Sequence, residues 1–319
     1  LISRIPSKEY VPHLSVALGA TALTWLVIAF IGSFPFVLGL HMSWTDSIFE
    51  AMSGWTGTGY SMIGNLDSTP KTLHFWRSLM QWVGGIGVIA FGIAMLSRSG
   101  LTEHLLYRAE GRSEALMPSV VSTGRRMWVI YVFLTVVFTG MVMFSGIPLW
   151  DALNLVMVAL ATGGFSLHNA SVSYYNNALL ELLLIPVMLA GALPFKLYFL
   201  MYKGKIRPFL QDRVVWLIFS LAIVGSLVVS IDLHIFNSLP LGTAIRQGFF
   251  CTVSGLTCCG LQNSNLHWIA SPLIVISLLM MIGGAAGSTS GGIKANRVIL
   301  GYEGLVWWFR RFFSRGRVI

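Results

Sequence analysis

Charged residues are scarce in this chain of 319 amino acids. Only 10% are Asp, Glu, Lys or Arg, against 55% hydrophobic residues, and the mean hydropathy is +0.75. So little polar surface excludes a soluble domain of this length. The sequence also has no GxxxxGK[ST], GxSxG or HExxH motif, so it indicates neither ATP-driven pumping nor hydrolysis, and we expect no enzyme.

Cysteine is almost absent as well. Cys251, Cys258 and Cys259 lack a histidine or a second cysteine pair at ligand spacing, which argues against a zinc-type site. They are expected to be small buried residues. The formal charge of +9 is accounted for by membrane topology and lipid contact, so no nucleic-acid partner is expected.

Long apolar stretches are abundant instead. Six of them have about the 20 residues that a helix needs to cross roughly 30 Å of hydrocarbon. These predicted spans are 14–40, 73–96, 127–147, 178–200, 214–231 and 271–300. The sequence therefore predicts an all-α integral membrane protein.

Shorter segments lie between paired spans at 43–55, 149–160 and 241–256, and each is too short to cross. They lead into glycine-centred turns, which are TGTGYS at 56–61, ATGGFS at 161–166 and TCCGLQ at 257–262. A turn can lie at membrane depth only where protein or a water-filled cavity surrounds it. The predicted module is a span, a re-entrant helix, a filter-like turn and a second span.

The module repeats along the chain. Gly59, Gly164 and Gly260 are spaced 105 and then 96 residues apart, and aligning them places Asp46 on Asp151. Three modules are present, and we expect them to surround one pore.

Start signals support the short helices. Ser43 or Thr45 can cap the first, while Pro148 and Pro240 precede the second and third. The negative C-terminal ends of these helices would point at the turns, which favours a cation there.

The turns have what a potassium filter needs. A dehydrated potassium ion requires a ring of oxygens, which backbone carbonyls supply, and glycine reaches the necessary dihedral angles without a Cβ penalty. The predicted ion-binding residues are Gly57, Thr58, Gly59, Thr162, Gly163, Gly164, Cys258, Cys259 and Gly260. The alternative, that a glycine only lets helices pack closely, is preferred for Gly84, Gly85 and Gly87.

The last span contains a glycine-rich interruption, IGGAAGSTSGGIK, at 282–294. We expect a non-helical gate beneath the filter, because a broken helix at membrane depth usually lines a cavity. The predicted gating residues are Gly283, Gly284, Gly287, Ser288, Thr289, Ser290, Gly291, Gly292 and Lys294. A packing bend is the alternative, and Lys294 taken alone is read as a snorkelling anchor.

Basic residues predict the orientation. With both ends of every module cytoplasmic, 18 of the 21 Lys and Arg lie inside, and only Lys71, Arg77 and Arg246 lie outside. The loops at 97–126 and 201–213 and the tail after Lys294 should then share one face. Two carboxylates, Glu50 and Glu181, are expected to be hydrogen-bonded or interfacial, although an intramembrane carboxylate is also a functional candidate.

Four motifs resemble one known family. FEAMSGWTGTGYS, HFWRSLMQWVGGIGVI, ATGGFS and above all GGAAGSTSGGIK resemble the Trk/Ktr/HKT superfamily of potassium transporters, in particular the prokaryotic Trk and Ktr membrane subunits. The resemblance implies four modules in a pseudo-fourfold ring, a homodimer and a cytoplasmic nucleotide-binding regulatory subunit. It also implies potassium preference from a glycine at the first filter, here Gly59. The chain stops after the third module, and we read it as a fragment.

The leading hypothesis is gated, channel-like potassium uptake across a prokaryotic plasma membrane, with potassium as transported ligand and no cofactor in this chain. The alternatives are a secondary transporter of a small solute or sodium that uses the broken sixth span, and a membrane scaffold. The predicted divisions are 1–97 for module 1, 98–126 for a cytoplasmic loop, 127–203 for module 2, 204–300 for module 3 and 301–319 for a basic cytoplasmic tail.

Overall fold

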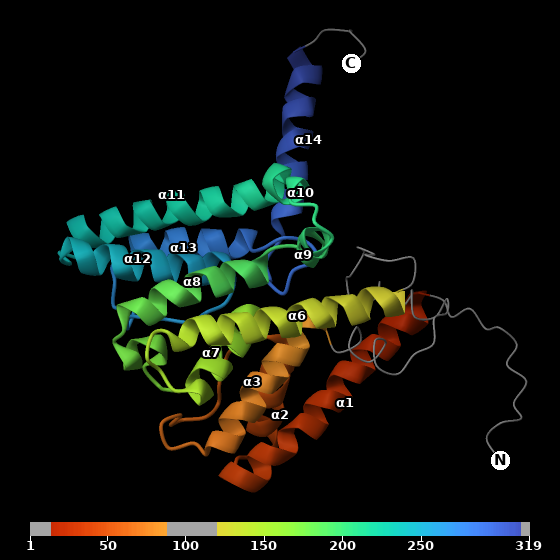
Figure 1. The fold of residues 1–319 in the computed structure, drawn as a ribbon, viewed down its shortest axis with the longest axis vertical. Coiled ribbons are helices and arrows are strands. Elements are labelled where there is room, and N and C mark those ends of the chain that lie inside the picture. Colours follow the sequence, from red (N-terminus) through yellow and green to blue (C-terminus); the bar gives the residue numbers. More distant parts are fainter. Residues whose placement is uncertain (1–13, 88–119, 314–319) are drawn as a thin grey trace, which may run out of the picture.

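The computed structural model describes residues 14–87 and 120–313, and within these ranges the regular elements are helices (Figure 1). They are α1 (Leu14–Leu40), α2 (Trp44–Thr56), α3 (Lys71–Ile86), α6 (Val120–Met143), α7 (Leu149–Ala161), a 3-10 helix at Ser171–Tyr175, α8 (Ala178–Ala192), α9 (Phe195–Tyr202), α10 (Arg207–Gln211), α11 (Arg213–Ile235), α12 (Leu241–Leu256), α13 (Ala270–Ile282) and α14 (Ala295–Phe313).

The three predicted re-entrant helices are present as α2, α7 and α12, each within a residue of its expected bounds. Their starts follow from local chemistry. The hydroxyl of Ser43 accepts a hydrogen bond from the backbone N–H of Asp46 at 3.2 Å, which caps α2. Pro148 and Pro240 occupy the N-caps of α7 and α12.

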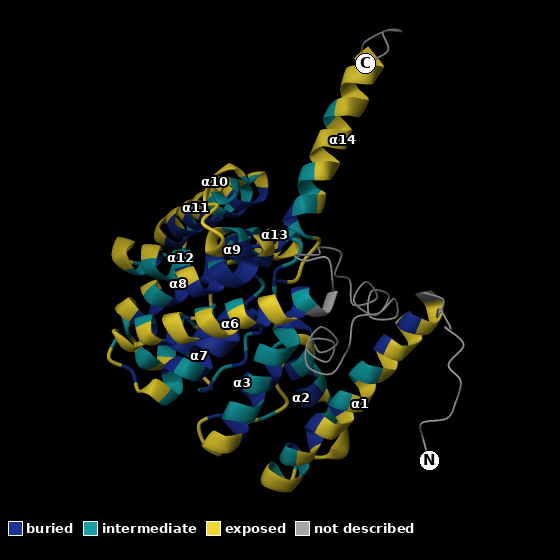
Figure 2. Ribbon diagram, turned by 45° about the vertical axis from the view of Figure 1, so that its right-hand side comes forward, coloured by how far each residue is buried: buried dark blue, intermediate teal, exposed yellow. Residues whose placement is uncertain are grey.

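Each short helix packs between the two longer helices of its own module. Thus α2 contacts α1 and α3, α7 contacts α6 and α8, and α12 contacts α11 and α13. Neighbouring modules are joined because α3 also packs on α7 and α8 on α12. The short helix α7 is consequently the most enclosed, and it is dark blue in Figure 2.

Apolar side chains cover the outside of the long helices. Leu38 on α1, Val136 on α6 and Val224 on α11 are more than half exposed (Figure 2). The largest buried cluster lies inside, between the second and third modules. An apolar exterior around a packed interior fits a protein whose solvent is lipid.

Three helices, α1, α6 and α11, are long and apolar enough to cross a membrane. The prediction of one uninterrupted span at 178–200 is wrong, because the chain bends by 97° between α8 and α9. Pro194, at the N-cap of α9, has no N–H to continue the first helix. The predicted break in the last span is confirmed, since α13 ends at Ile282 and α14 begins at Ala295.

Two further predicted boundaries can be compared with the helices. Helix α14 continues to Phe313, so the expected end of module 3 at residue 300 falls inside a helix. Residues 88–96 of the second predicted span, and 98–119 of the predicted cytoplasmic loop, lie outside the described residues. Arg213, at the end of the segment 201–213, forms an ion pair of 2.7 Å with Glu303 of α14, so these two parts of the chain meet, while their common cytoplasmic face stays a prediction.

The second helix of each module carries a glycine at one common place. Gly84 in α3, Gly191 in α8 and Gly283 after α13 each lie thirteen residues beyond the first residue of their helix. A Cβ on Gly84 or Gly191 would overlap a carbonyl near the end of that module's short helix. In the third module the same position begins the glycine-rich loop.

Candidate functional site

The three glycine turns have one backbone conformation. Gly59, Gly164 and Gly260 have φ angles of 82°, 82° and 83°. This left-handed region is open to glycine and costly for residues with a Cβ. The repeat read from the sequence is therefore also a repeat of backbone geometry.

The residue two positions before each of these glycines is also left-handed. Gly57, Thr162 and Cys258 have φ angles of 66°, 53° and 56°. Gly57 and Thr162 cap the C-terminal ends of α2 and α7, and the N–H of each donates back into its own helix, whereas α12 is capped by Thr257, one residue before Cys258. With these N–H groups turned toward the helix, the turn is left with carbonyls to present.

The turns touch one another in order around a common centre. A Cβ on Gly59 would lie 2.5 Å from the carbonyl oxygen of Gly163, and one on Gly164 would overlap the carbonyl oxygen of Cys259. A Cβ on Gly260 would find its nearest neighbour, the Cα of Gly164, at 3.8 Å. The structure thus brings the three predicted turns together, while their binding of an ion stays a prediction.

A buried glutamine fixes the second turn. The side chain of Gln81, on α3, donates from Nε2 to the carbonyl of Gly163 at 2.6 Å. Its Oε1 accepts from the N–H of Phe165 at 3.0 Å. Gln81 is fully buried, so both amide groups need these partners. Sequence reasoning missed it, although one glutamine inside an apolar run was the available signal.

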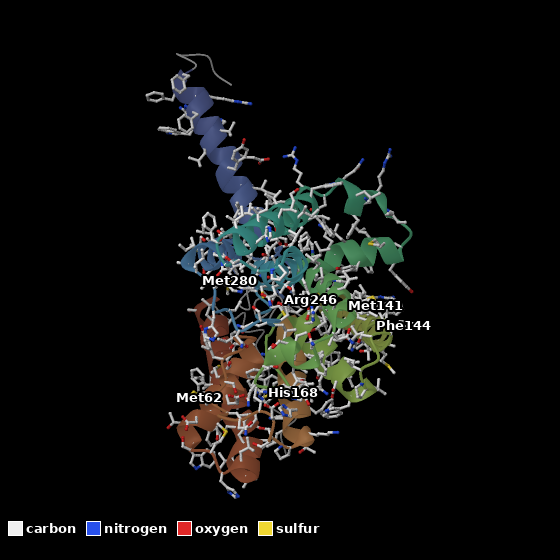
Figure 3. The ribbon with its side chains drawn as sticks, turned by 90° about the vertical axis from the view of Figure 1, so that its left-hand side faces the viewer. Met62, Met141, Phe144, His168, Arg246 and Met280 are labelled. Carbon is white, nitrogen blue, oxygen red and sulfur yellow. The ribbon has the colours of Figure 1, made fainter. Side chains whose placement is uncertain are left out.

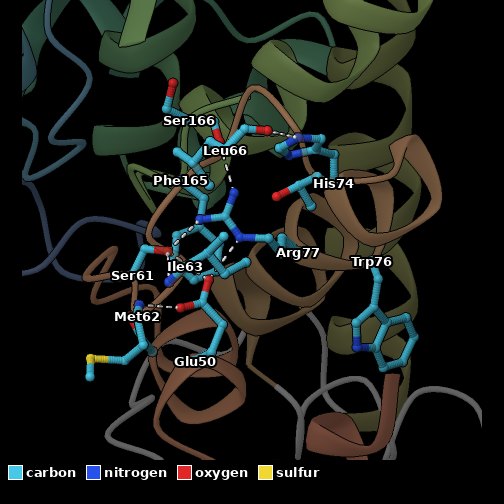
Figure 4. A network of polar contacts seen from close by, with 12 residues as sticks. Glu50, Ser61, Met62, Ile63, Leu66, His74, Trp76, Arg77, Phe165 and Ser166 are labelled. Carbon is cyan, nitrogen blue, oxygen red and sulfur yellow. Dashed lines mark hydrogen bonds and ion pairs between the residues drawn. The ribbon is translucent and has the colours of Figure 1, made fainter. Parts of the chain in front are cut away.

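An ion pair connects the first turn to the second (Figure 4). Glu50 on α2 and Arg77 on α3 are 2.8 Å apart, with side chains 0% and 1% exposed. The carboxylate of Glu50 also accepts from the Ser61 hydroxyl at 3.0 Å and from the N–H of Met62 at 2.7 Å. Its oxygens are therefore satisfied by the segment that follows the first filter glycine.

Arg77, the other member of the pair, contacts the second turn. Its Nη1 donates to the carbonyl of Ser166 at 2.8 Å, and its guanidinium lies 4.1 Å from the ring centre of Phe165. Arg77 was expected on the extracellular side of the membrane, which stays a prediction, and the structure buries it as a brace between modules. A buried ion pair is stable only when its remaining hydrogen-bonding groups are satisfied, as they are here.

A second ion pair joins the second and third modules. The Nε and Nη2 atoms of Arg246, on α12, each donate to a carboxylate oxygen of Glu181, on α8, at 2.7 Å. Arg246 is labelled in Figure 3. The amide of Asn263, which follows the third turn, donates to the same carboxylate at 2.7 Å. Here the arginine side chain is 34% exposed. The hydrogen-bonded role considered for Glu50 and Glu181 is confirmed for both.

The electrostatics of the turns come from the backbone. Residues 56–61, 161–166 and 257–262 contain no charged side chain, and the nearby carboxylate of Glu50 is neutralised by Arg77. The C-terminal ends of α2, α7 and α12 lead into the turns and carry partial negative charge. The arrangement favours a cation without fixing a formal charge beside it.

The loop between α13 and α14 lies under two of the turns. Thr289 donates from its hydroxyl to the carbonyl of Leu160 at 2.9 Å, near the end of α7. Ser290 donates to the carbonyl of Thr257 at 2.7 Å, at the end of α12. Ser288 instead donates within the loop, to Ala285. Two of the three predicted hydroxyls therefore hold the loop to the pore helices.

Lys294 turns back into the loop. Its ammonium donates to the carbonyl of Ser290, and its φ of 81° is left-handed. The expectation of a simple snorkelling anchor is replaced by a contact inside the protein. Lys294 and Arg297 also line a cavity of about 520 Å³ together with Thr56, which ends α2.

The glycines Gly84 and Gly85 pack as predicted. A Cβ on Gly84 would overlap the carbonyl of Trp55, and one on Gly85 would lie 3.1 Å from the Cα of Ala161. These glycines bring α3 against the ends of two short helices. Gly87, with φ of 101°, closes α3 instead.

Residues 6–315 match the family described as TrkH, a cation transport protein. The chain belongs to this family. The family is described as one of cation transport proteins, and the apolar helices of this chain fit a multi-pass protein of the cell membrane. Its helical repeat is the family's fold.

Known relatives agree with that assignment. The chain is 35% identical over 290 residues to an uncharacterised cation transporter of Methanocaldococcus jannaschii, covering 90% of this chain and 59% of the relative. It is 32% identical over 293 residues to the Trk system potassium uptake protein TrkH of Escherichia coli, covering 87% and 59%. The chain thus spans less than two thirds of either relative's length.

A solved structure has the same fold. The crystal structure of the potassium transporter TrkH from Vibrio parahaemolyticus superimposes with a TM-score of 0.83 at 28% identity, covering 98% of this chain and 65% of that one. The similarity therefore extends over all three modules described above.

Proposed function

We propose that this TrkH-family chain forms part of a gated, channel-like pathway for potassium uptake. The observation that carries the proposal is the convergence of three turns with one left-handed backbone conformation and no charged side chain. Carbonyl oxygens in such turns can replace the water shell of a dehydrated cation. Potassium as the ion is supported by the relatives from Escherichia coli and Vibrio parahaemolyticus, which are named for potassium.

Gating is assigned to the loop 283–294. Its hydroxyls are hydrogen-bonded to the ends of α7 and α12, which supports a position below the turns from which it would block an ion. Few apolar contacts need to be broken to move such a loop. We further propose the homodimer and the cytoplasmic nucleotide-binding subunit that the family resemblance implies, with both to be tested by purification of the full-length protein.

A solute carrier that uses the same break as its binding site has less support. The hydroxyls of Thr289 and Ser290 are already donated to pore-helix carbonyls, which leaves them unavailable as donors to a solute. A sodium pathway differs from a potassium pathway only in the dimensions of the turns. The first filter glycine therefore gives the sharper test.

The filter proposal is tested by Gly59→Ser in the full-length protein. The new Cβ would lie 2.5 Å from the carbonyl oxygen of Gly163 on a left-handed backbone, so we expect the potassium-to-sodium uptake ratio to fall about tenfold or more while protein abundance changes less. Uptake of rubidium and sodium tracers measures the ratio. An unchanged ratio in a well-expressed variant would contradict a filter role for Gly59.

The gate is tested by deleting residues 287–290. Deletion removes Thr289 and Ser290 and with them the hydroxyl contacts to α7 and α12, so we expect higher flux and weaker control by the cytoplasmic subunit. Tracer flux with and without that subunit provides the measurement. Flux equal to that of the unmodified protein would leave the packing-bend alternative standing.

A further inference from the structure

Helices α9 and α10 form a basic and apolar surface beside the gating loop. Four basic side chains on it are exposed, and they are Lys196, Lys203, Lys205 and Arg207. Apolar side chains alternate with them: Tyr202, Ile206 and Leu210 are 76%, 55% and 59% exposed. We call the surface formed by these seven residues the α9–α10 surface.

Acidic groups do little to neutralise this surface. The stretch from Phe195 to Gln211 contains no Asp or Glu. The adjacent Asp212 accepts from the N–H groups of Val214 and Val215 as the N-cap of α11. The other nearby acid, Glu303, is paired with Arg213. Within residues 14–87 and 120–313, no ion pair involves the four basic residues of the α9–α10 surface.

The position of the surface indicates what covers it. Helix α9 turns from α8 by 97° (Figure 1). With α8 as a membrane span, α9 runs along the membrane plane where α8 ends. The next membrane helix, α11, starts directly after α10 and carries Trp216, which is 61% exposed, in its first turn. Aromatic and basic residues at this depth are typical of the headgroup layer on the cytoplasmic side.

The same bend is hydrogen-bonded to the gating loop on both sides. Before it, the N–H of Thr289 donates to the carbonyl of Gly191 at 3.1 Å and that of Ala285 to Ala192 at 2.9 Å. After it, the N–H of Phe195 donates to the carbonyl of Gly287 at 3.1 Å. A force on α9 is therefore transmitted directly to loop backbone.

We propose that the α9–α10 surface binds the headgroups of anionic phospholipids and that this binding holds the gating loop in its closed position. The chemistry is phosphate recognition by Lys and Arg, with apolar side chains entering the upper acyl region. Bound lipid fixes α9 in the membrane plane, which fixes the residues on both sides of the bend that the loop is bonded to. The proposal rests on the proposed function of the loop as a gate.

The test uses the full-length protein in liposomes. Flux of rubidium is compared in bilayers of phosphatidylcholine alone and with phosphatidylglycerol added at constant ionic strength. We expect the anionic lipid to lower flux severalfold in the unmodified protein. In Lys205→Gln/Arg207→Gln we expect no such decrease, and we expect binding of phosphatidylglycerol to weaken about 30-fold, roughly fivefold for each basic residue near an anionic surface.

Controls separate lipid binding from transport. Arg310→Gln/Arg311→Gln removes the same charge from α14, several turns beyond the loop, and should keep the response to phosphatidylglycerol. Lipid binding is measured by native mass spectrometry, which does not depend on flux. Inorganic phosphate in place of phosphatidylglycerol should have no effect, since it lacks acyl chains.

Each outcome has one meaning. Equal lipid binding by the unmodified protein and Lys205→Gln/Arg207→Gln overturns the site, and so does a response to inorganic phosphate. If a soluble cytoplasmic protein produced the same decrease in rubidium flux without phosphatidylglycerol, the surface would be assigned to that protein instead of to lipid. If the variant loses lipid binding while its rubidium flux stays equal to that of the unmodified protein, the link to the gate is overturned. Absence of rubidium flux under every condition contradicts the proposed function and leaves the binding result to be judged separately.

Discussion

The contact between the first and second turns differs from the contact between the second and third. Between the first two, the ion pair of Glu50 and Arg77 is fully buried and bonds to both turns directly. Between the last two, the pair of Glu181 and Arg246 is partly exposed and reaches Asn263, after the third turn, and Asn176, but neither turn itself. The gating loop fills the space beneath the last two instead.

This difference separates two requirements of a gated pore. A filter needs fixed distances between its carbonyls, and the first contact supplies them with a satisfied buried network. A gate needs contacts that can be broken, and the loop under the second contact is held by hydroxyl and backbone hydrogen bonds. The chain thus concentrates rigidity at one contact and movement at the other.

The largest effect is expected from alanine at the turn glycines. Gly164→Ala would overlap the carbonyl of Cys259 on a left-handed backbone, so potassium uptake should fall at least about 100-fold. Gly146→Ala has the same backbone strain, about 1–2 kcal/mol, but it lies outside the turns and its Cβ would meet nothing within 4 Å, so a loss of no more than about tenfold is expected. Uptake per transporter in the membrane distinguishes them. Equal losses would mean that strain alone decides the outcome.

A smaller but still large effect is expected at the first ion pair. Arg77→Met leaves Glu50 buried without its partner, which should lower the free energy of unfolding by about 3–5 kcal/mol. Glu50→Gln added to Arg77→Met should recover part of that loss. Thermal unfolding in detergent, followed by intrinsic fluorescence, provides the measurement.

The matched variant at the second contact is Arg246→Met. Its arginine is partly exposed, and Asn263 still donates to Glu181, so a loss of about 1–2 kcal/mol is expected. If Arg246→Met destabilises the protein as much as Arg77→Met, the two contacts are equally rigid and the contrast between them is wrong.

The smallest effect is expected from one hydroxyl of the loop. Thr289→Val removes a hydroxyl whose one proton is shared between the carbonyls of Leu160 and Gly191. This donor contributes about 1 kcal/mol, so flux should rise about fivefold and the free energy of unfolding should fall by no more than about 1 kcal/mol. Ser288→Ala is the control, because Ser288 donates only within the loop, to Ala285. Similar flux in the two variants would show that contact with α7 does not hold the loop.

Local sequence signals predicted much of this architecture. Proline before α7 and α12 sets where these helices begin, because its ring fixes φ and removes an N–H. The glycines of the turns mark where the chain departs from helical geometry. The break at 283–294 was visible for the same reason. Convergence of the turns followed from the repeat, since equal modules around one centre place equal residues together.

The braces could not be predicted from the sequence. Arg77 was visible as a charge, but its partner Glu50 lies 27 residues away on another helix, and only the packing of α3 on α2 and α7 brings them together. Gln81 was hidden because its partners are backbone groups of a different module. The bend at Pro194 was missed because the apolar run continues through it, and hydropathy does not register direction.

Gly84, Gly191 and Gly283 occupy one position that the modules use in two ways. In α3 and α8 the glycine lets the helix lie against a carbonyl of its own short helix, whereas in the third module the chain departs from the helix at that point to form the loop. The modules therefore differ at their second helices while their turn glycines share one backbone conformation. One module can thus carry a moving part at this position without a different filter turn.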